Sequence, residues 1–434
     1  MHRLIVVGGG AGGLELATQL GDRFGAKRTH QQMNITLLDR NPTHVWKPLL
    51  HEVAAGSMDP HSHQLDYAAQ AYLHGFRFKQ GALSGIDRTR KIIFVDPVHD
   101  NDGLELWPAR IFQYDTLVIA VGSTTHFFGV AGAEEHALAL DTVEQAECFR
   151  RRLITAAMGA GSTAAAERPR KINIAIVGGG ATGVELAAKL RSTADVLSVY
   201  GLQHLHPYED IGITLIESGP RVLPALSERV SKAVAQILVQ RSVNIMSGEH
   251  VVEVTAKSLR TRSGKAVSAD IAVWAAGIKA PAVLSKLDGL NVSVAGQLFV
   301  RQTLQTDGDD NIFALGDCAC CPISDTGRTV PPRAQAAHQQ ASFLVKAISR
   351  RLSGRDILGF QYRDLGSFVS LGHDSAVGSG LASGSLFIGG LLARVMYKSL
   401  YRMHVAALHG WPRMLLNTLS HRLRRTTAPH VKLH

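Results

Sequence analysis

Short apolar runs recur along the chain, and stretches with leucine and alanine at helical spacing lie between them. Residues 4–7 and 174–177 are such runs, and each leads through glycines into a helical pattern. Near-continuous apolar runs joined by helices are typical of parallel sheets that are covered on both faces. The pattern therefore predicts an α/β protein. Further buried strands are predicted at residues 35–38, 117–121, 213–216, 271–276 and 311–315.

An internal repeat is the strongest signal in the sequence. Residues 8–20 (GGGAGGLELATQL) and 178–190 (GGGATGVELAAKL) are identical at nine of thirteen positions, and each follows an apolar run. Such glycines permit a tight turn, the approach of the backbone to a pyrophosphate and close packing of helix on sheet. We therefore predict two Rossmann-like dinucleotide-binding units. Their glycines are Gly8, Gly10 and Gly13 in the first copy and Gly178, Gly180 and Gly183 in the second.

An acidic residue ends the next apolar run in each copy. Asp39 and Glu217 stand 26 and 34 residues after the last glycine of their motifs. A carboxylate at this place binds the ribose hydroxyls of the adenosine. Glu217 would repel the 2′-phosphate of NADP, so the second unit is expected to take NADH, although Arg221 lies nearby. A chance acid at a strand end is the alternative for each residue.

Length and composition narrow the class further. The chain has 434 residues, of which 45% are hydrophobic and 19% charged, enough for two or three domains with full cores. Four cysteines exclude a disulfide framework. Met1 leads almost directly into the first apolar run, so no secretory signal is expected and the protein should face the cytosol.

The positive charge is concentrated in the last residues of the chain. The formal net charge is +10, but residues 375–434 contain eight Lys and Arg and no Asp or Glu, which leaves the first 374 residues with a net charge of +2. Residues 391–408 and 411–425 alternate basic with large apolar side chains, which predicts two amphipathic helices. Residues 375–393 contain too many glycines for a spanning helix and indicate short strands and turns.

Three interpretations of these basic helices stay open. They fit peripheral binding to an anionic membrane surface through inserted leucines, which we favour. They also fit packing on the body of the protein or on a second copy of the chain. Binding to nucleic acid is the third and least favoured interpretation.

The assembly resembles the two-dinucleotide-binding-domain flavoproteins, similar in architecture to glutathione reductase, over residues 3–345. The resemblance implies that the first unit binds FAD noncovalently and that the second unit, inserted within the first, binds NADH. It implies an FAD-binding domain at 1–130 and 291–365, an NADH-binding domain at 165–290 and a membrane-anchoring region at 366–434. Gly122, Gly277 and Asp317, which follow later apolar runs, are the further cofactor-binding residues that it implies.

Disulfide reductases of this superfamily carry a redox cysteine pair after the second strand, but residues 41–52 contain no cysteine. The segment 47–56 (KPLLHEVAAG), residues 334–339 (AQAAHQ) and the basic C-terminus resemble the type II NADH dehydrogenases, single-subunit NADH:quinone oxidoreductases of respiratory membranes. In that family an AQxAxQ helix near the flavin forms the quinone site. The residues thereby implied are Ala334, Gln335, His338 and Gln339.

Glu185 and the cysteine cluster at residues 318–321 allow two interpretations each. The resemblance gives Glu185 a role in positioning the nicotinamide or coupling the two half-reactions. Glu15 is its counterpart in the first copy, so shared electrostatics at a helix start is the alternative. Cys318, Cys320 and Cys321 lack a second cluster at metal spacing, so small buried residues are favoured over a metal or redox site.

The resemblance implies a peripheral enzyme on the cytoplasmic face of the inner (plasma) membrane. A hydride passes from NADH to FAD, and two electrons then reach a membrane quinone without proton pumping. The implied partners are NADH, the quinone, an anionic lipid surface at residues 391–425 and a second copy of the chain, but no nucleic acid and no metal. A soluble FAD/NADH reductase of a small redox protein is the main alternative; a membrane- or nucleic-acid-binding flavoprotein that uses NADH for signalling is the other.

Overall fold

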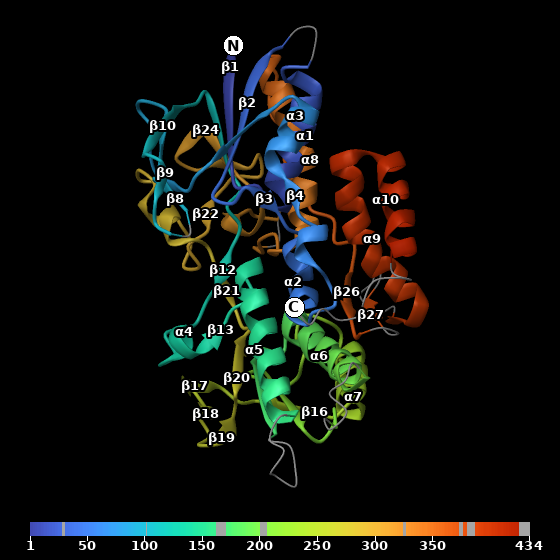
Figure 1. Cartoon of the computed structure of the whole chain (residues 1–434). Coiled ribbons are helices and arrows are strands. Elements are labelled where there is room, and N and C mark those ends of the chain that lie inside the picture. Colours follow the sequence, from blue (N-terminus) through green and yellow to red (C-terminus); the bar gives the residue numbers. More distant parts are fainter. Residues whose placement is uncertain are drawn as a thin grey trace.

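Two sheets of mainly parallel strands, each flanked by helices, form the body of the molecule (Figure 1). The computed structural model describes residues 1–27, 31–100, 102–161, 171–199, 206–323, 327–372, 376–379 and 387–424. The strands of the second sheet fall between the early and late strands of the first along the sequence. The predicted α/β class, with one dinucleotide-binding unit inserted in the other, is therefore confirmed.

The first sheet has six strands, and all but β23 run parallel. Their order is β23 (Gln305–Thr306), β24 (Asp309–Ala314), β11 (Thr116–Ile119), β1 (His2–Val7), β2 (Met33–Asp39) and β5 (Arg77–Gln80). Three helices pack beside it (Figure 1): α1 (Ala11–Phe24), α3 (Tyr67–His74) and α8 (Ala334–Leu352). A smaller antiparallel sheet contains β6 (Leu83–Asp87), β7 (Ile92–Val95) and β10 (Arg110–Gln113).

The second sheet has five parallel strands. Their order is β13 (Ala137–Leu138), β20 (Ile271–Trp274), β14 (Ile172–Val177), β15 (Ile211–Glu217) and β16 (Val243–Ser247). Its helices are α5 (Val143–Gly161), α6 (Ala181–Val199) and α7 (Glu228–Gln240), and β17 (Val251–Val254), β18 (Ser258–Thr261) and β19 (Ala266–Ser268) form an antiparallel extension.

The chain crosses between the two units through a pair of short strands. β12 (Thr124–Thr125) leaves the first unit and pairs antiparallel with β21 (Ile278–Lys279), which returns to it. β13 and α5 thus precede residue 165, where the second unit was expected to start. A strand as short as β13 carries no apolar run that sequence reasoning would detect.

The C-terminal region matches the elements predicted for it. β26 (Ser367–Ser370), β27 (Ala376–Ser379) and β28 (Phe387–Gly389) form an antiparallel sheet, followed by α9 (Gly390–His409) and α10 (Trp411–Arg424). α9 packs against α1 of the first unit, and α10 packs on α9 (Figure 1). Arg425 and Lys432 lie outside the described residues.

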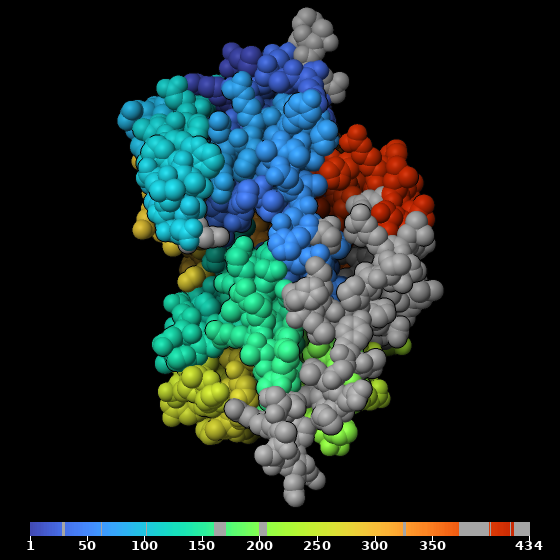
Figure 2. Space-filling model, viewed as in Figure 1, coloured from blue at the N-terminus to red at the C-terminus, as the bar shows by residue number. Residues whose placement is uncertain are grey.

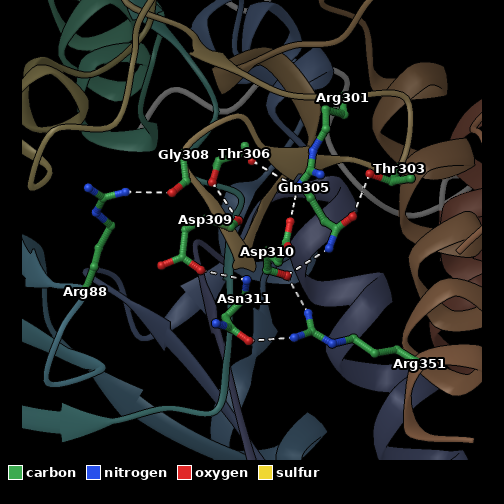
Figure 3. Close-up of polar contacts among 10 residues, drawn as sticks. All are labelled: Arg88, Arg301, Thr303, Gln305, Thr306, Gly308, Asp309, Asp310, Asn311 and Arg351. Carbon is green, nitrogen blue, oxygen red and sulfur yellow. Dashed lines mark hydrogen bonds and ion pairs between the residues drawn. The ribbon is translucent and has the colours of Figure 1, made fainter. Parts of the chain in front are cut away.

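Arg351 fixes the C-terminal end of α8 to β24 (Figure 3). Its guanidinium donates hydrogen bonds to the carbonyl of Asp310 and to Oδ1 of Asn311, both at 2.5 Å. Gln305 donates to the same Asp310 carbonyl at 2.9 Å, and Arg88 donates to the carbonyl of Gly308 at 2.8 Å. These contacts hold the β23–β24 turn and the C-terminal end of α8 together. This end of the helix lies away from Gln335 and His338, which are near its N-terminus.

We expect Arg351→Met to destabilise the protein and Arg355→Met, at an exposed position four residues further on, to leave its stability unchanged. The first change removes two hydrogen bonds to a charged donor, which contribute about 1.5–3 kcal/mol each in well-ordered sites. Thermal unfolding of the two FAD-loaded variants measures the difference. Equal melting temperatures would show that the Arg351 contacts do not stabilise α8.

Candidate functional site

Both glycine motifs form the same strand–turn–helix cradle. Gly8 and Gly178 follow β1 and β14 with φ of +103° and +110°, a backbone conformation that favours glycine. A Cβ on Gly13 would lie 1.9 Å from the carbonyl oxygen of Gly8. The space beside Gly10 and Gly180 is open, so the second glycine of each motif leaves room for a ligand beside the helix N-terminus.

Asp39 and Glu217, at the ends of β2 and β15, turn their carboxylates back to the glycine loops. Oδ2 of Asp39 accepts a hydrogen bond from the N–H of Gly9 at 2.6 Å. Oε2 of Glu217 accepts one from the N–H of Gly179, also at 2.6 Å. Because both copies make the same contact, each acid is bonded to the glycine loop of its own cradle.

A cavity of about 1950 Å³ joins the two cradles and reaches the C-terminal helices. Most of the residues predicted from the sequence line it. These are Gly8, Gly10, Asp39, Gly122, Gly180, Glu185, Gly277, Asp317, Ala334, Gln335 and His338. Five others, all in described ranges, lie outside this lining: Gly13, Gly178, Gly183, Glu217 and Gln339.

An ion pair stands in the cavity where the two units meet. Nζ of Lys47 lies 2.8 Å from Oδ1 of Asp141 and donates to the carbonyl of Ser123 at 2.9 Å. The hydroxyl of Ser123 in turn donates to Asp317 at 2.8 Å. Burial opposes ionisation of Asp141, but Lys47 outweighs it, so the pKa of this carboxyl is lowered. Lys47 is thus linked through Ser123 to the predicted cofactor residue Asp317.

Glu185 lies on the cavity wall of the second unit. Its Oε1 accepts a hydrogen bond from the N–H of Ser370 at 3.0 Å, and its Oε2 lies 3.5 Å from Nδ1 of His51. Burial lowers the pKa of His51 to about 4, so this imidazole is neutral at neutral pH. Glu185 therefore joins the second cradle to the C-terminal β26 through hydrogen bonding.

The two glutamines of α8 hold the segment that follows this helix. Oε1 of Gln335 accepts from the N–H of Leu365 at 3.1 Å, and its Nε2 donates to the carbonyl of Gly366 at 3.2 Å. Gln339 and the backbone of Arg363 exchange two hydrogen bonds, of 2.8 and 3.0 Å. Both amides, expected to face a quinone carbonyl, are thus engaged with residues 363–366, and only Gln335 also lines the cavity.

Glu15 is fully buried between three helices. Its Oε2 lies 2.5 Å from Nδ1 of His338 on α8, and its Oε1 lies 2.6 Å from Nδ1 of His404 on α9. Nε2 of His404 lies 3.0 Å from Nε2 of His44, whose Nδ1 lies 2.9 Å from the carbonyl oxygen of Gly9. This chain of contacts, the Glu15 network, links the first cradle to the C-terminal helices.

Sequence reasoning missed Lys47, Asp141, His44 and His404. The repeat places Glu15 at the position equivalent to Glu185, which could have identified it as a functional residue. Lys47 is the first residue of the segment 47–56, on which the family resemblance rests. His404 lies in a stretch that was interpreted only as an amphipathic helix. Nothing in the sequence brings these residues together.

The first cradle fits the expected FAD. In the described structure no side chain caps the N-terminus of α1, and its first turn contains no acidic residue, so its free N–H groups suit a pyrophosphate. Gly10, Ala11 and Gly12 line the cavity at this end. Asp39 and Asp317, the two acids expected to bind the cofactor, line the same cavity.

The cysteines beside this site are in their inert, protonated form. Burial raises the pKa of Cys318 and of Cys321 to about 12, so neither thiol ionises at neutral pH. Burial also raises the pKa of Cys320. This agrees with the interpretation of the cluster as small buried residues beside the cofactor.

The last helix leaves a row of leucines in solvent. Trp411, Leu415, Leu416 and Leu419 of α10 are each more than half exposed, while Met414 is buried against α9. Of the helices in the described ranges, none combines the length and the apolar character needed to cross a bilayer.

Comparisons with known proteins place the chain in a family. A family model described as pyridine nucleotide-disulphide oxidoreductase matches residues 2–341. The type II NADH:quinone oxidoreductase of Haemophilus influenzae is 41% identical over 449 aligned positions that cover all of both chains. Its counterpart in Staphylococcus aureus is 28% identical and covers 87% of this chain and 89% of that protein.

Two solved structures show the shared fold. NDH2 from Plasmodium falciparum in complex with NADH has a TM-score of 0.79 at 18% identity and covers 93% of this chain and 94% of that one. The sulfide:quinone oxidoreductase of Aquifex aeolicus has a TM-score of 0.72 at 18% identity and covers 94% of this chain and 92% of that one. On the full-length match and the family model, the chain belongs to the pyridine nucleotide-disulphide oxidoreductases and, within them, to the type II NADH:quinone oxidoreductases.

Proposed function

We propose that this chain oxidises NADH held at the second cradle and reduces a membrane quinone beside α8 and α9, without proton pumping. The observation that carries the proposal is the cavity that joins Gly10, Gly180 and His338 in one space. The first cradle, with Gly10, Asp39 and Asp317 in the cavity lining, would hold FAD noncovalently, and bound FAD would supply the acceptance of a hydride and the transfer of two electrons. We assign the FAD unit to residues 1–130 and 291–365 and the NADH unit to residues 165–290, extended toward β13.

The side chains around the cavity orient the reactants. Lys47 places a positive charge beside Asp317, where it favours the anionic parts of a bound dinucleotide. Glu185, bonded to Ser370 and beside neutral His51, positions the nicotinamide at the wall between the two units. Ala334, Gln335 and His338 contact the quinone, and Gln339 acts by holding residues 363–366 in place.

The assay that tests this proposal is NADH oxidation by purified, FAD-loaded protein with and without a short-chain quinone. We expect rapid flavin bleaching by NADH and multiple turnovers only when quinone is added. Bleaching without quinone turnover would favour a protein acceptor over the site at α8. No bleaching would show that the second cradle does not bind NADH productively.

We propose that Glu217 makes the enzyme prefer NADH to NADPH. Its carboxylate is fixed by the N–H groups of Gly179 and Gly219, both at 2.6 Å, so it stands where it would repel a 2′-phosphate. Glu217→Gln keeps the shape and removes the charge. We expect the ratio of kcat/KM for NADPH to that for NADH to rise about tenfold or more, which corresponds to ~1.4 kcal/mol.

Glu209→Gln, at an exposed position on the same unit, is the matched control and should leave the ratio unchanged. An unchanged ratio in Glu217→Gln would show that the carboxylate only stabilises the glycine loop and does not select between NADH and NADPH.

We propose that α10 binds the cytoplasmic face of the membrane through its exposed leucines. The described atoms of α9 and α10 form an outer surface of the molecule on one side of the first unit (Figure 2). Arg413 is exposed on the same helix, and cations near an anionic leaflet add up to ~1 kcal/mol each. Leu415, Leu416 and Leu419 would enter the interface, which suits the basic sequence of residues 391–425.

The triple substitution of Leu415, Leu416 and Leu419 by Ser should lower the affinity for vesicles of anionic lipid by more than about tenfold, since each buried leucine contributes roughly 1.5–3 kcal/mol. Co-sedimentation with vesicles measures it. Leu104→Ser with Leu106→Ser, which changes exposed leucines of the first unit, is the control. If the triple variant binds vesicles normally but changes from dimer to monomer, this face is a contact between two copies instead.

A further inference from the structure

The hydrogen bonds of the Glu15 network fix where its protons lie. The carbonyl of Gly9 only accepts, so Nδ1 of His44 must carry a proton and donate to it at 2.9 Å. Burial and the nearby His404 lower the pKa of His44 to about 3, so its Nε2 is unprotonated. That nitrogen therefore accepts the 3.0 Å contact from Nε2–H of His404.

His404 bridges Glu15 and His44. Its Nδ1 lies 2.6 Å from the carboxylate of Glu15, and its Nε2 lies 3.0 Å from Nε2 of His44. The ring of Trp46 packs against this imidazole with 4.2 Å between centroids. Glu15 is thus held by two imidazoles, one from His338 and one from His404.

His338 is the member of the network that faces the cavity. Its Nδ1 lies 2.5 Å from Glu15, its side chain is 28% exposed, and it lines the cavity wall between α8 and α9. In the described part of the chain no hydrogen bond engages its Nε2. The hydrogen bond to Glu15 raises the pKa of His338 against the effect of burial, which favours an Nε2–H directed at a bound molecule.

We propose that His338 donates the proton that completes quinone reduction, and that Glu15, itself held by His404, is the positioning residue that orients the His338 imidazole. This inference rests on the proposed function. NADH supplies two electrons and one proton, whereas a quinone needs two of each to become a quinol. The Nε2–H bond of His338 breaks as the second O–H bond of the quinol forms, and the neutral imidazole takes a new proton from water in the cavity.

The network leaves His338 ready for the next turnover. When Nε2 loses its proton, Nδ1–H stays bonded to Glu15, so the lone pair remains on the cavity side. The carboxylate keeps its contact with His404 throughout, so it is not left without a hydrogen-bond partner in the interior. At the N-terminal end of α8, the same end as His338, Arg333 and Asp364 lie 3.4 Å apart as an ion pair, and Asp364 also accepts from Gln335. Arg402 of α9 lines the same cavity, whereas Lys346, Arg350 and Arg351 lie further along α8.

Replacement of His338 by Gln tests the proposal, because the amide still donates to Glu15 but releases no proton. In rapid-mixing experiments with the FAD-loaded enzyme, flavin reduction by NADH should be unchanged. Reoxidation by a short-chain quinone should slow by about 10²–10⁴-fold, the range for loss of a general acid. Reoxidation by ferricyanide, which takes electrons without protons, should stay at the wild-type rate.

The pH profile separates proton donation from a purely structural role. The wild-type quinone step should be fast at low pH and fall as the pH rises through the raised pKa of His338. Glu15→Gln removes the charge that raises this pKa, so the falling limb should move to lower pH while the ferricyanide rate holds. This second variant also tests the proposal if His338→Gln does not fold.

Several results would overturn the inference without affecting the proposed function. These are normal quinone reoxidation in His338→Gln, equal slowing with quinone and ferricyanide, or a limb that does not move in Glu15→Gln. His136→Gln, on α4 (Ala133–His136) and outside the cavity lining, controls for the loss of a histidine as such. Failure of the wild-type enzyme to reduce quinone at all would instead contradict the proposed function.

Discussion

A carboxylate that is closed off from water must be paired, because an uncompensated charge in the interior costs several kcal/mol. Glu15 is completely buried on α1, and its partners His338 and His404 come from α8 and α9. The need to pair this one charge therefore requires three helices, far apart in the sequence, to meet beside the first glycine loop. The position of the C-terminal helices on the FAD unit depends on that contact and on the packing of Leu408 into the same core.

The two copies of the glycine motif place a glutamate at the same helical position but surround it differently. Glu185 accepts from a backbone N–H and lies beside a neutral histidine, so its surroundings provide hydrogen bonds. Glu15 contacts the imidazoles of His338 and His404, so its partners are titratable groups. One local sequence thus gives two different sets of contacts, and the difference comes from the elements packed over each helix.

The parts of this site that are local in sequence could be predicted, and the parts that depend on distant packing could not. Glycine spacing fixes the cradles because steric limits act between neighbours, and Asp39 and Glu217 follow from the strand that comes next. The contacts of Lys47 with Asp141 and of Glu15 with His404 join residues from separate elements, and no periodicity encodes such pairs. Gln339 lies on a helix, as predicted, but its amide forms two hydrogen bonds with the backbone of Arg363. Arg363 lies outside the helix, so this contact could not be predicted from helical spacing.

The C-terminal helices serve the cavity and the surface at once. α9 turns His404 inward and adds Tyr401 and Met403 to the cavity wall, while α10 contributes Met414 to that wall and leaves Leu415 and Leu416 exposed. The same two helices thus complete the contact of Glu15 with His404 and carry the exposed leucines. Displacing them from the body would remove part of the cavity wall and leave Glu15 with one imidazole partner fewer. This accounts for a basic, apolar C-terminal region attached to a body that is close to electrically neutral.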